Sequence, residues 1–140
     1  MARLDPYKNY NFQVEIQGIT VAGFSEVSGL SSEVEVIEYR EGGDHLTRKL
    51  PGLKKFTNVV LKRGMTTSRD LYNWHKALLQ GTLERRHATI VLLDDQRTEV
   101  ARWQLVDAFP QKYEGPRLNA KTSEVAIETF VLCCEWIELE

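Results

Sequence analysis

The order of apolar and polar residues along the chain predicts a protein made mostly of β-strands. In residues 9–18, Tyr10, Phe12, Val14 and Ile16 alternate with polar residues, so these four side chains share one face of an extended segment. Such period-two alternation is typical of a strand with one buried and one exposed face. Comparable patterns predict further extended segments over residues 19–30, 31–40, 56–64, 85–95, 98–109 and 123–139.

Interruptions of these patterns indicate where strands bend or end. The alternation of the 31–40 segment slips at Ile37, which indicates a β-bulge. Residues 94–97 are typical of a hairpin turn, and the segment 110–120, which contains proline and glycine, is typical of a connection. Residues 130–134 are apolar on both faces of their strand, so we expect cover on both sides, within the fold or from another chain.

One segment has helical rather than strand periodicity. Its apolar face is formed by Leu71, Trp74, His75 and Leu78. Thr67 is suited to cap the N-terminus of this helix, with Asp70 three residues later as an acidic partner, and Gly81 is placed to end it. The spacing therefore predicts a helix over about 67–80.

Together these patterns predict a single domain over residues 1–140 that is mainly β. We expect an antiparallel β-sandwich or barrel with one α-helix at about 67–80. A long extended loop over about 41–56 lies outside this pattern, because it is rich in glycine and charge and has few large apolar residues with which to bury itself.

Charge is distributed unevenly around this loop. Acidic residues precede it or begin it, at Glu33, Glu35, Glu38 and Glu41, and basic residues follow, at Arg48, Lys49, Lys54 and Lys55. The two groups can pair within one molecule or between copies, or they can be two solvated faces whose ion pairs contribute at most about 1 kcal/mol each. The long predicted strands have edges that nothing in the chain obviously covers, and this favours self-assembly, with a closed ring as the simplest solution.

Composition excludes several classes of protein. The chain has 140 residues and a formal net charge of −2, which argues against a general nucleic-acid binder. The first ten residues contain no apolar run of the kind found in signal peptides, so we expect synthesis and folding in the cytoplasm unless an unusual route exports the protein. The longest apolar run, at 130–134, is too short to cross a bilayer, and we expect no stable membrane binding by the subunit.

No group of residues predicts catalysis or metal binding. His45, His75 and His87 fall in a loop, a helix and a strand without the spacing of metal ligands. Cys133 and Cys134 are adjacent, so in a strand they point to opposite faces and are better explained as small apolar side chains than as a disulfide or zinc site. We therefore predict no catalytic residues, no cofactor, no metal and no enzymatic activity.

Several sequence blocks resemble the tail-tube family of contractile phage tails and phage-tail-like contractile injection systems. In order along the chain they are "NFQVEIQGITVAGFSEVSGL", "VIEYREGG", "RKLPGLKKF", "VVLKRG", "LYNWH", "RWQLVDAFPQKYEGPRLNA" and "EVAIETFVLCCEWIEL". The resemblance extends from Asp5 to Leu139, and it is the combination of "FSEVSGL", "YREGG", "LPG", "LKRG" and "GPRLNA" that makes it specific.

The resemblance implies a β-sandwich or barrel subunit that forms hexameric rings, whose sheets join into a continuous inner barrel. Stacked rings form a hollow tube for an effector protein or DNA. The implied partners are further copies of the chain, a sheath protein, baseplate and spike proteins, tape-measure and terminator or cap proteins, and a transient cargo. The implied location is a phage tail or a phage-tail-like particle, extracellular or membrane-anchored.

The resemblance also suggests which residues contact other subunits. The 41–56 loop would reach onto neighbouring subunits and help to stack the rings. Its residues would be the apolar anchors Leu46, Leu50 and Leu53, the turn residues Gly42, Gly43, Gly52 and Pro51, and the basic residues Arg48, Lys49, Lys54 and Lys55. Candidates to line the lumen are Asn11, Gln13, Glu15 and Gln17, or else Glu33 and Glu35, which could instead meet the basic loop of an adjacent subunit.

Two alternatives to a main tube subunit stay open. A baseplate or adaptor protein of the same fold would start or cap the tube and would form one ring without stacking. A monomeric ligand-binding barrel, or an enzyme with an unusual site, would need an interior pocket ringed by polar groups, and the sequence points to none.

Overall fold

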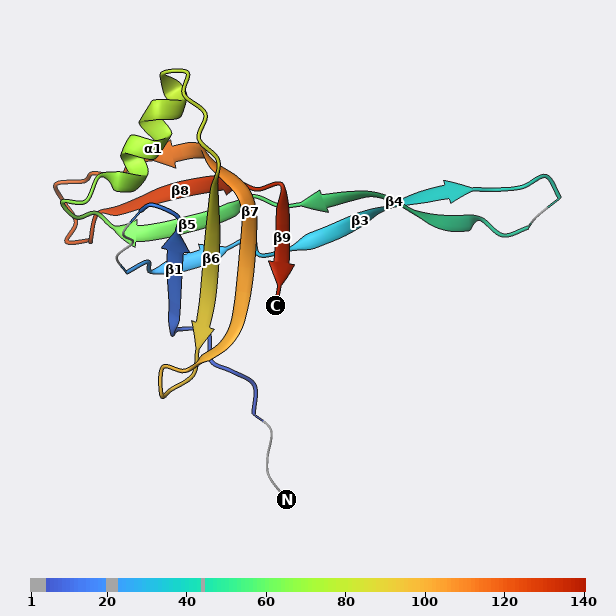
Figure 1. The fold of residues 1–140 in the computed structure, drawn as a ribbon, viewed down its shortest axis with the longest axis horizontal. Coiled ribbons are helices and arrows are strands. Elements are labelled where there is room, and N and C mark those ends of the chain that lie inside the picture. The colour runs from blue at the N-terminus through green and yellow to red at the C-terminus, as the bar shows by residue number, and fades with distance from the viewer. Residues whose placement is uncertain (1–4, 20–22, 44) are drawn as a thin grey trace.

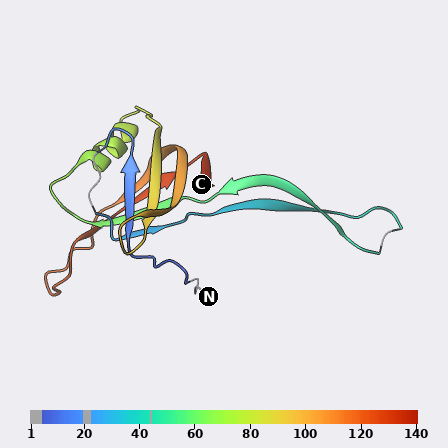
Figure 2. The ribbon, with the colours of Figure 1, turned by 60° about the horizontal axis from the view of Figure 1, so that its bottom comes forward.

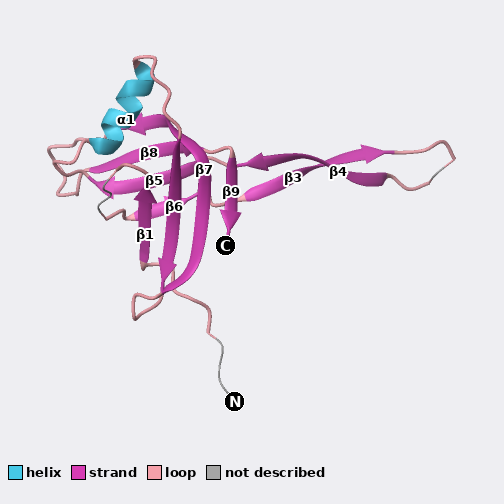
Figure 3. Ribbon diagram, viewed as in Figure 1, coloured by secondary structure: helices cyan, strands magenta, loops and turns pink. Residues whose placement is uncertain are grey.

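The computed structural model describes residues 5–19, 23–43 and 45–140 as two layers of antiparallel strands, one helix and a long two-stranded projection (Figures 1 and 3). The strands are β1 (Phe12–Ile16), β2 (Glu26–Ser28), β3 (Ser32–Tyr39), β4 (Arg48–Phe56), β5 (Val59–Gly64), β6 (Arg86–Leu93), β7 (Glu99–Glu114), β8 (Ile127–Cys133) and β9 (Trp136–Leu139), with the helix α1 (Asp70–Leu79) between β5 and β6. The predicted fold class is confirmed.

The two layers share one strand. The first layer has the order β1-β6-β7-β9, and the second consists of β8, β5 and β2 beside the far half of β7. β7 changes layer at a bulge, where Ala88 pairs with Leu105 and Arg86 with Ala108. Asp107 lies in this bulge with a left-handed backbone, at φ 50°, which is a conformation that aspartate tolerates better than most residues. The curved course of β7 therefore joins both layers into one incomplete barrel (Figure 1).

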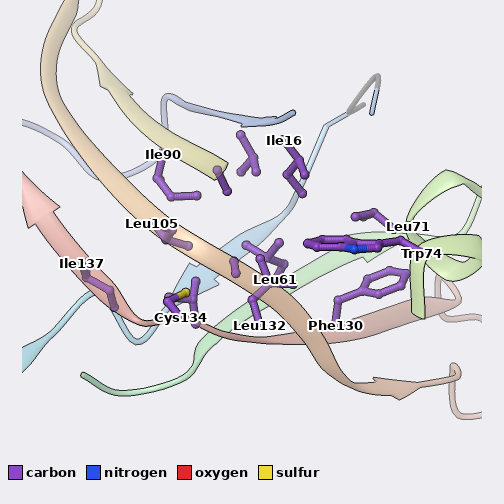
Figure 4. Packing of buried hydrophobic residues seen from close by; sticks show 14 residues of the cluster. Ile16, Leu61, Leu71, Trp74, Ile90, Leu105, Phe130, Leu132, Cys134 and Ile137 are labelled. Atoms are coloured by element: carbon purple, nitrogen blue, oxygen red, sulfur yellow. The ribbon is translucent and has the colours of Figure 1, made fainter. Parts of the chain in front are cut away.

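The core lies between the layers and is closed on one side by the helix (Figure 4). Phe130, Leu61 and Leu132 have no exposed surface. From α1, Trp74 enters the same cluster, and its indole Nε1 donates a hydrogen bond to the Glu84 carbonyl at 2.7 Å. His75 is bonded through Nδ1 to the Pro110 carbonyl at 2.8 Å, so it is a packing residue of the helix–sheet contact.

The helix is shorter than expected at its start. It begins at Asp70 with Arg69 at the N-cap, so the prediction of Thr67 as cap is wrong. The reason is a local turn: the Arg69 Nη1 donates to the carbonyls of Thr66 and Ser68, and the Ser68 amide donates to the Thr66 hydroxyl. At the other end, Gly81 has a φ of 96° and its amide donates to the Leu78 carbonyl, which confirms its predicted role.

Two strand ends also differ from the sequence pattern. The predicted connection 110–120 begins late, because β7 continues through Pro110 to Glu114; a second bulge between Pro110 and Lys112 accommodates the missing amide. The predicted strand 123–139 is divided, because β8 pairs with the second layer whereas β9 pairs with the first half of β7. At the division, the Glu135 amide donates to the Val106 carbonyl.

The structure confirms the predicted hairpin turn and corrects the predicted direction of Tyr10. The turn at 94–97 is confirmed, with Asp94 Oδ1 accepting the amides of Gln96 and Thr98. Tyr10, predicted to point inward, precedes β1 and is 60 % exposed, since its hydroxyl donates to Asp95 instead. Of the segment 19–30, residues 20–22 lie outside the described residues.

The apolar run at 130–134 is buried on alternate residues. Phe130, Leu132 and Cys134 face the core, whereas Val131 and Cys133 are half-buried on the outer side. Both thiols are free. The predicted cover on the outer face is therefore only partial within this chain.

Candidate assembly surfaces

The most prominent surface feature is a hairpin of β3 and β4, called the arm below (residues 32–56), which projects far from the body (Figures 1 and 2). The arm continues the β2–β5 pair of the second layer, because Ser28 pairs with Val60 and, after a short break, Ser32 pairs with Phe56. The break requires Gly29, whose φ is 88° and whose position leaves only 2.1 Å between an added Cβ and the Asn58 carbonyl oxygen.

The predicted extended loop at 41–56 needs correction, because its second half is a strand. Of the described residues in this segment, only 41–43 and 45–47 are outside regular structure, and β4 begins at Arg48. β4 forms because β3 supplies a partner of opposite charge: Glu33 lies opposite Lys55, and Glu38 lies opposite Lys49. The arm is thus a twisted β-ribbon.

The acidic and basic groups of the arm therefore pair within one molecule. Lys55 Nζ lies 2.6 Å from Glu35 Oε1, with both side chains partly exposed. The hydrogen bond and the charge of Glu35, together with the nearby Glu33, raise the pKa of the Lys55 amine above its ordinary value. Of the alternatives that the sequence left open, internal pairing is the arrangement that this structure contains.

A β-bulge divides the arm into two parts. Val34 pairs with Lys54 but Val36 pairs with Pro51, so Gly52 and Leu53 together oppose Glu35. The bulge predicted at Ile37 therefore lies between Val34 and Val36 instead, and its extra residue belongs to β4. Gly52 leaves room for Ile37, since an added Cβ would lie 3.0 Å from the Ile37 Cγ1 atom.

The apolar side chains of the arm are uncovered. The predicted anchors Leu46, Leu50 and Leu53 are 70, 48 and 73 % exposed. Sequence reasoning missed a second set, Val34, Val36, Ile37 and Tyr39, which are 39–62 % exposed. Alternation in β3 suggested burial within the domain, but a two-stranded ribbon has no second layer to bury them. By the strand register, these apolar side chains are shared between the two faces of the ribbon. Exposed apolar surface on this scale marks a binding site for another molecule.

The arm is held to the body at its base by contacts with β9. The rings of Phe56 and Trp136 lie 4.6 Å apart, and Lys54 Nζ lies 5.3 Å above the Trp136 ring. At the break, the Thr57 hydroxyl donates to the Gly29 carbonyl at 2.8 Å. These contacts fix the direction in which the arm leaves the body.

A second candidate surface is the outer face of the first layer. Gln13 and Glu15 are exposed on β1, and the exposed Gln17 directly follows this strand. Asn11 precedes β1 and donates to the Asp94 carbonyl at 3.4 Å. In register with Glu15 are three polar residues that sequence reasoning missed, Thr89, Gln104 and Glu138, on β6, β7 and β9. The alternation of β6 and β7 contained this signal, but the order of the strands in the sheet was needed to read it.

The two sets of lumen candidates lie in different places. Gln13, Glu15 and Gln17 form one edge of a mostly polar face, which Val91 interrupts beside Gln13 and within which the Thr89 hydroxyl donates to Gln104 Oε1 at 2.8 Å. Glu33 and Glu35 are on the arm. A single surface cannot include both sets within one subunit.

A buried ion pair lies in the second layer, where Arg63 on β5 is directly opposite Glu128 on β8. Arg63 Nε donates to Glu128 Oε1 at 2.7 Å, and both side chains are 3 % exposed. The Tyr113 hydroxyl donates to the second carboxylate oxygen at 3.1 Å, and burial together with Glu128 raises the pKa of this phenol. The pair is enclosed by the core, where each charge depends on the other for compensation.

Residues 5–19, 23–43 and 45–140 contain no cluster of histidine, cysteine and acidic residues that could hold a metal ion. Over the same ranges, α1 is not long or apolar enough to cross a membrane.

An open two-layer barrel with one helix and a projecting hairpin is also the fold of subunits in contractile injection systems. A chain of the PVC sheath/tube terminator of an extracellular contractile injection system, in the extended state, has a TM-score of 0.91 at 28 % identity and covers 99 % of this chain and 99 % of that one. A chain of the PVC sheath–tube complex has a TM-score of 0.88 at 27 % identity, covering 96 % and 91 %. A chain of the tube-terminating cap of the anti-feeding prophage has 0.91 at 26 %, covering 100 % and 94 %.

The sequence shows the family directly. Residues 8–138 match the T4-like virus tail tube protein gp19 family, and the chain belongs to it. No curated protein matches the chain in sequence.

Proposed function

We propose that this chain is the repeating structural subunit of the inner tube of a contractile injection system or contractile phage tail. Membership of the tail tube family over residues 8–138 carries the proposal. The arm supports it, because its apolar side chains need another molecule for burial. The family is one of structural tube proteins, and we accordingly propose no catalytic activity and no cofactor.

The free edges of the first layer supply the contact for a ring. β1 and β9 are its two edge strands, each paired on one side only within the described residues. β9 of one copy would pair with β1 of the next, which joins the first layers into one closed sheet and leaves no edge free. Six copies would close the ring, and rings would stack into a tube.

The outer polar face of the first layer would then line the bore. Gln13, Glu15 and Gln17 would lie there together with Gln104 and Glu138. Arg102 shares this face and is ion-paired with Glu99, so the lining would be polar and mixed in charge. A polar, mixed or acidic lining suits a passage, because tight binding of nucleic acid depends on neutralising phosphates with basic residues. The cargo would be an effector protein or DNA.

The tube would function inside a larger particle. A sheath around it, a baseplate with a spike at one end, a tape-measure protein, and a terminator or cap at the other end are the partners that we propose. The subunit would be assembled in the cytoplasm into a phage tail or phage-tail-like particle.

A second function of the same fold also has direct support. Chains of the anti-feeding prophage cap and of its baseplate match this chain with TM-scores of 0.91 and 0.89. A protein that starts or caps the tube would form a single ring and would not stack.

Electron microscopy and light scattering of the purified protein test both candidates. Tubes of stacked rings would support the main tube subunit, and single rings that never stack would support the cap or baseplate protein. A protein that stays monomeric at high concentration, even when baseplate is added as a nucleus, would contradict both.

A further inference from the structure

An apolar cleft opens in the body at the free edge of β2, and is called the β2 cleft below. It has a volume of about 670 Å³ and is lined by six apolar residues, Phe12, Val27, Leu30, Ile90, Leu92 and Trp103. Asn9, Ser25 and Glu26 form its polar rim. Pockets that bind drug-sized ligands have volumes of about 300–1,000 Å³, so the cleft is large enough to receive apolar side chains of another chain.

The cleft exists because the second layer ends before the first layer does. The strand order of the second layer runs β7-β8-β5-β2, and within the described residues β2 is paired with β5 alone. Past β2, the strands β1, β6 and β7 continue toward the turn at 94–97 without a second layer above them (Figure 1). Leu92, the residue before the last of β6, and Phe12, opposite it on β1, therefore line the cleft at this end of the body.

The opposite end of the first layer has an exposed apolar projection. Residues 80–85 connect α1 to the start of β6, so the C-terminal end of α1 lies at the other end of β6 from the cleft (Figure 1). Leu79 and Leu83, on either side of this turn, are 70 and 48 % exposed.

Hydrogen bonds hold the turn at the end of α1 in place. The Thr82 amide donates to the Ala77 carbonyl at 2.8 Å. Together with the bond from the Gly81 amide described above, this forms the Schellman motif that commonly ends helices. The projecting leucines are thus carried by an ordered backbone, which lowers the entropic cost of binding.

We propose that the helix end of each subunit inserts Leu79 and Leu83 into the β2 cleft of a subunit in the adjacent ring. The inference rests on the proposed function, because it assumes rings closed by pairing of β9 with β1. Strands of a closed barrel lie about 35–45° from its axis, so the two ends of β6 fall at opposite faces of the ring. When rings stack in one orientation, the helix ends of one ring therefore meet the clefts of the next.

Charge as well as apolar surface suits this contact. Lys76 is exposed in the last turn of α1, three residues before Leu79 and so on the same side of the helix. At the rim of the cleft, Glu26 is 56 % exposed, and its carboxylate, 3.3 Å from Lys62 Nζ, has room for a second cation. An apolar helix end with a basic group therefore faces an apolar cleft with an acidic rim.

The contact would use different surfaces on the two faces of a ring. A heterologous contact of this kind that does not close on itself generates an open filament. Each added ring would present the same free surface as the ring before it, so the contact would define both the direction and the continuation of the stack.

Photo-crosslinking of assembled protein tests this site. A benzoylphenylalanine residue replaces Leu79 or, as a matched probe, Leu118 on the loop between β7 and β8, which is 83 % exposed. Assemblies are formed from equal amounts of ¹⁴N- and ¹⁵N-labelled subunits, irradiated and digested, so that mixed-isotope peptides identify contacts between copies. We expect the Leu79 probe to attach to a peptide of another copy that contains Phe12, Val27 or Leu92, in stacked rings and not in single rings. The Leu118 probe should not give these products.

The outcomes separate this inference from the proposed function. Stacked rings whose Leu79 probe attaches elsewhere, or gives no contact between copies, would overturn the cleft contact and leave the tube function standing. Wild-type protein that forms no rings, or rings that never stack, as seen by electron microscopy, would overturn the main tube function and this contact with it.

A substitution provides a second measurement. Leu79→Glu should reduce the fraction of rings found in stacks at least tenfold, because it places a carboxylate against an apolar cleft with an acidic rim. Single rings should form in normal yield, because β1 and β9 are unchanged, and Leu118→Glu should alter neither quantity. Circular dichroism of the monomer should be unchanged in both variants, because both side chains are exposed in the subunit. Tubes of normal length and yield from Leu79→Glu would contradict the proposal.

Discussion

The body and the arm are both built from antiparallel strand pairs, yet they differ in what the pairing achieves. In β5 of the body, Val59, Leu61 and Arg63 are buried on one face. In β4 of the arm, no residue is fully buried. Both regions form backbone hydrogen bonds along a ladder, but only the body adds apolar burial, which is the dominant favourable term in folding. The body therefore has a core of its own, whereas the apolar side chains of the arm can be buried only by another molecule.

The largest expected difference between the two regions concerns their ion pairs. Glu128→Gln removes the carboxylate that faces the buried Arg63 and should lower the free energy of unfolding by about 3–5 kcal/mol, because an uncompensated charge stays in the core. Glu35→Gln breaks the exposed pair with Lys55 and should cost less than about 1 kcal/mol. Urea denaturation of the monomer measures both, and equal losses would contradict the distinction.

Replacing one leucine by alanine in each region compares how much apolar burial contributes to the stability of the body and of the arm. Leu61→Ala leaves a cavity in the core and should cost about 2–5 kcal/mol. Leu53→Ala, at a position 73 % exposed, should change the stability of the monomer by less than about 0.5 kcal/mol. Thermal unfolding of the two variants checks the comparison; a large loss from Leu53→Ala would mean that the arm is packed in the free subunit.

Charge reversal on the arm should separate assembly from folding. The double variant Lys54→Glu and Lys55→Glu should weaken assembly, because it places like charges beside Glu33 and Glu35 and distorts the ribbon. It should leave the subunit folded, with a change in stability of at most about 1 kcal/mol per exposed pair. Tubes of normal yield and salt resistance, seen by electron microscopy, would show that the arm's charges are not needed.

The smallest expected effect on the subunit comes from chemical labelling of its thiols. Burial, with a smaller effect of Cys133, raises the pKa of Cys134 to about 12, so at pH 8 only about one molecule in ten thousand carries the thiolate. Iodoacetamide should therefore leave Cys134 unmodified in the folded subunit, whereas a Leu53→Cys variant should be labelled rapidly at the arm. Mass spectrometry of the labelled peptides measures this, and rapid labelling of Cys134 would indicate that the body opens.

The sequence predicted the body better than the arm, for a physical reason. Alternating segments such as Val14 and Ile16 gave the correct buried face, because each has a second layer above it. The same alternation at Val34 and Val36 suggested burial that the subunit does not provide. Periodicity indicates which side chains share a face, and it cannot indicate whether that face is covered by the same chain.

Long-range pairing was the other limit of the sequence. Residues 123–139 are divided between two layers because β8 and β9 pair with different parts of β7. No local pattern at Glu135 indicates this division. The basic residues at 48–55 looked like loop residues, because lysine and arginine have little preference for strands without a partner. Only the register with Glu33 and Glu38 explains why they form β4.

The course of β7 has a mechanical consequence. This strand has 16 residues and is hydrogen-bonded to neighbours in both layers, so the layers are connected by a continuous backbone as well as by packed side chains. A push on one layer is transmitted to the other through covalent bonds and a ladder of hydrogen bonds. Sliding of one layer past the other would break hydrogen bonds of β7 with β6 or with β8, so a subunit built this way resists shear between its layers.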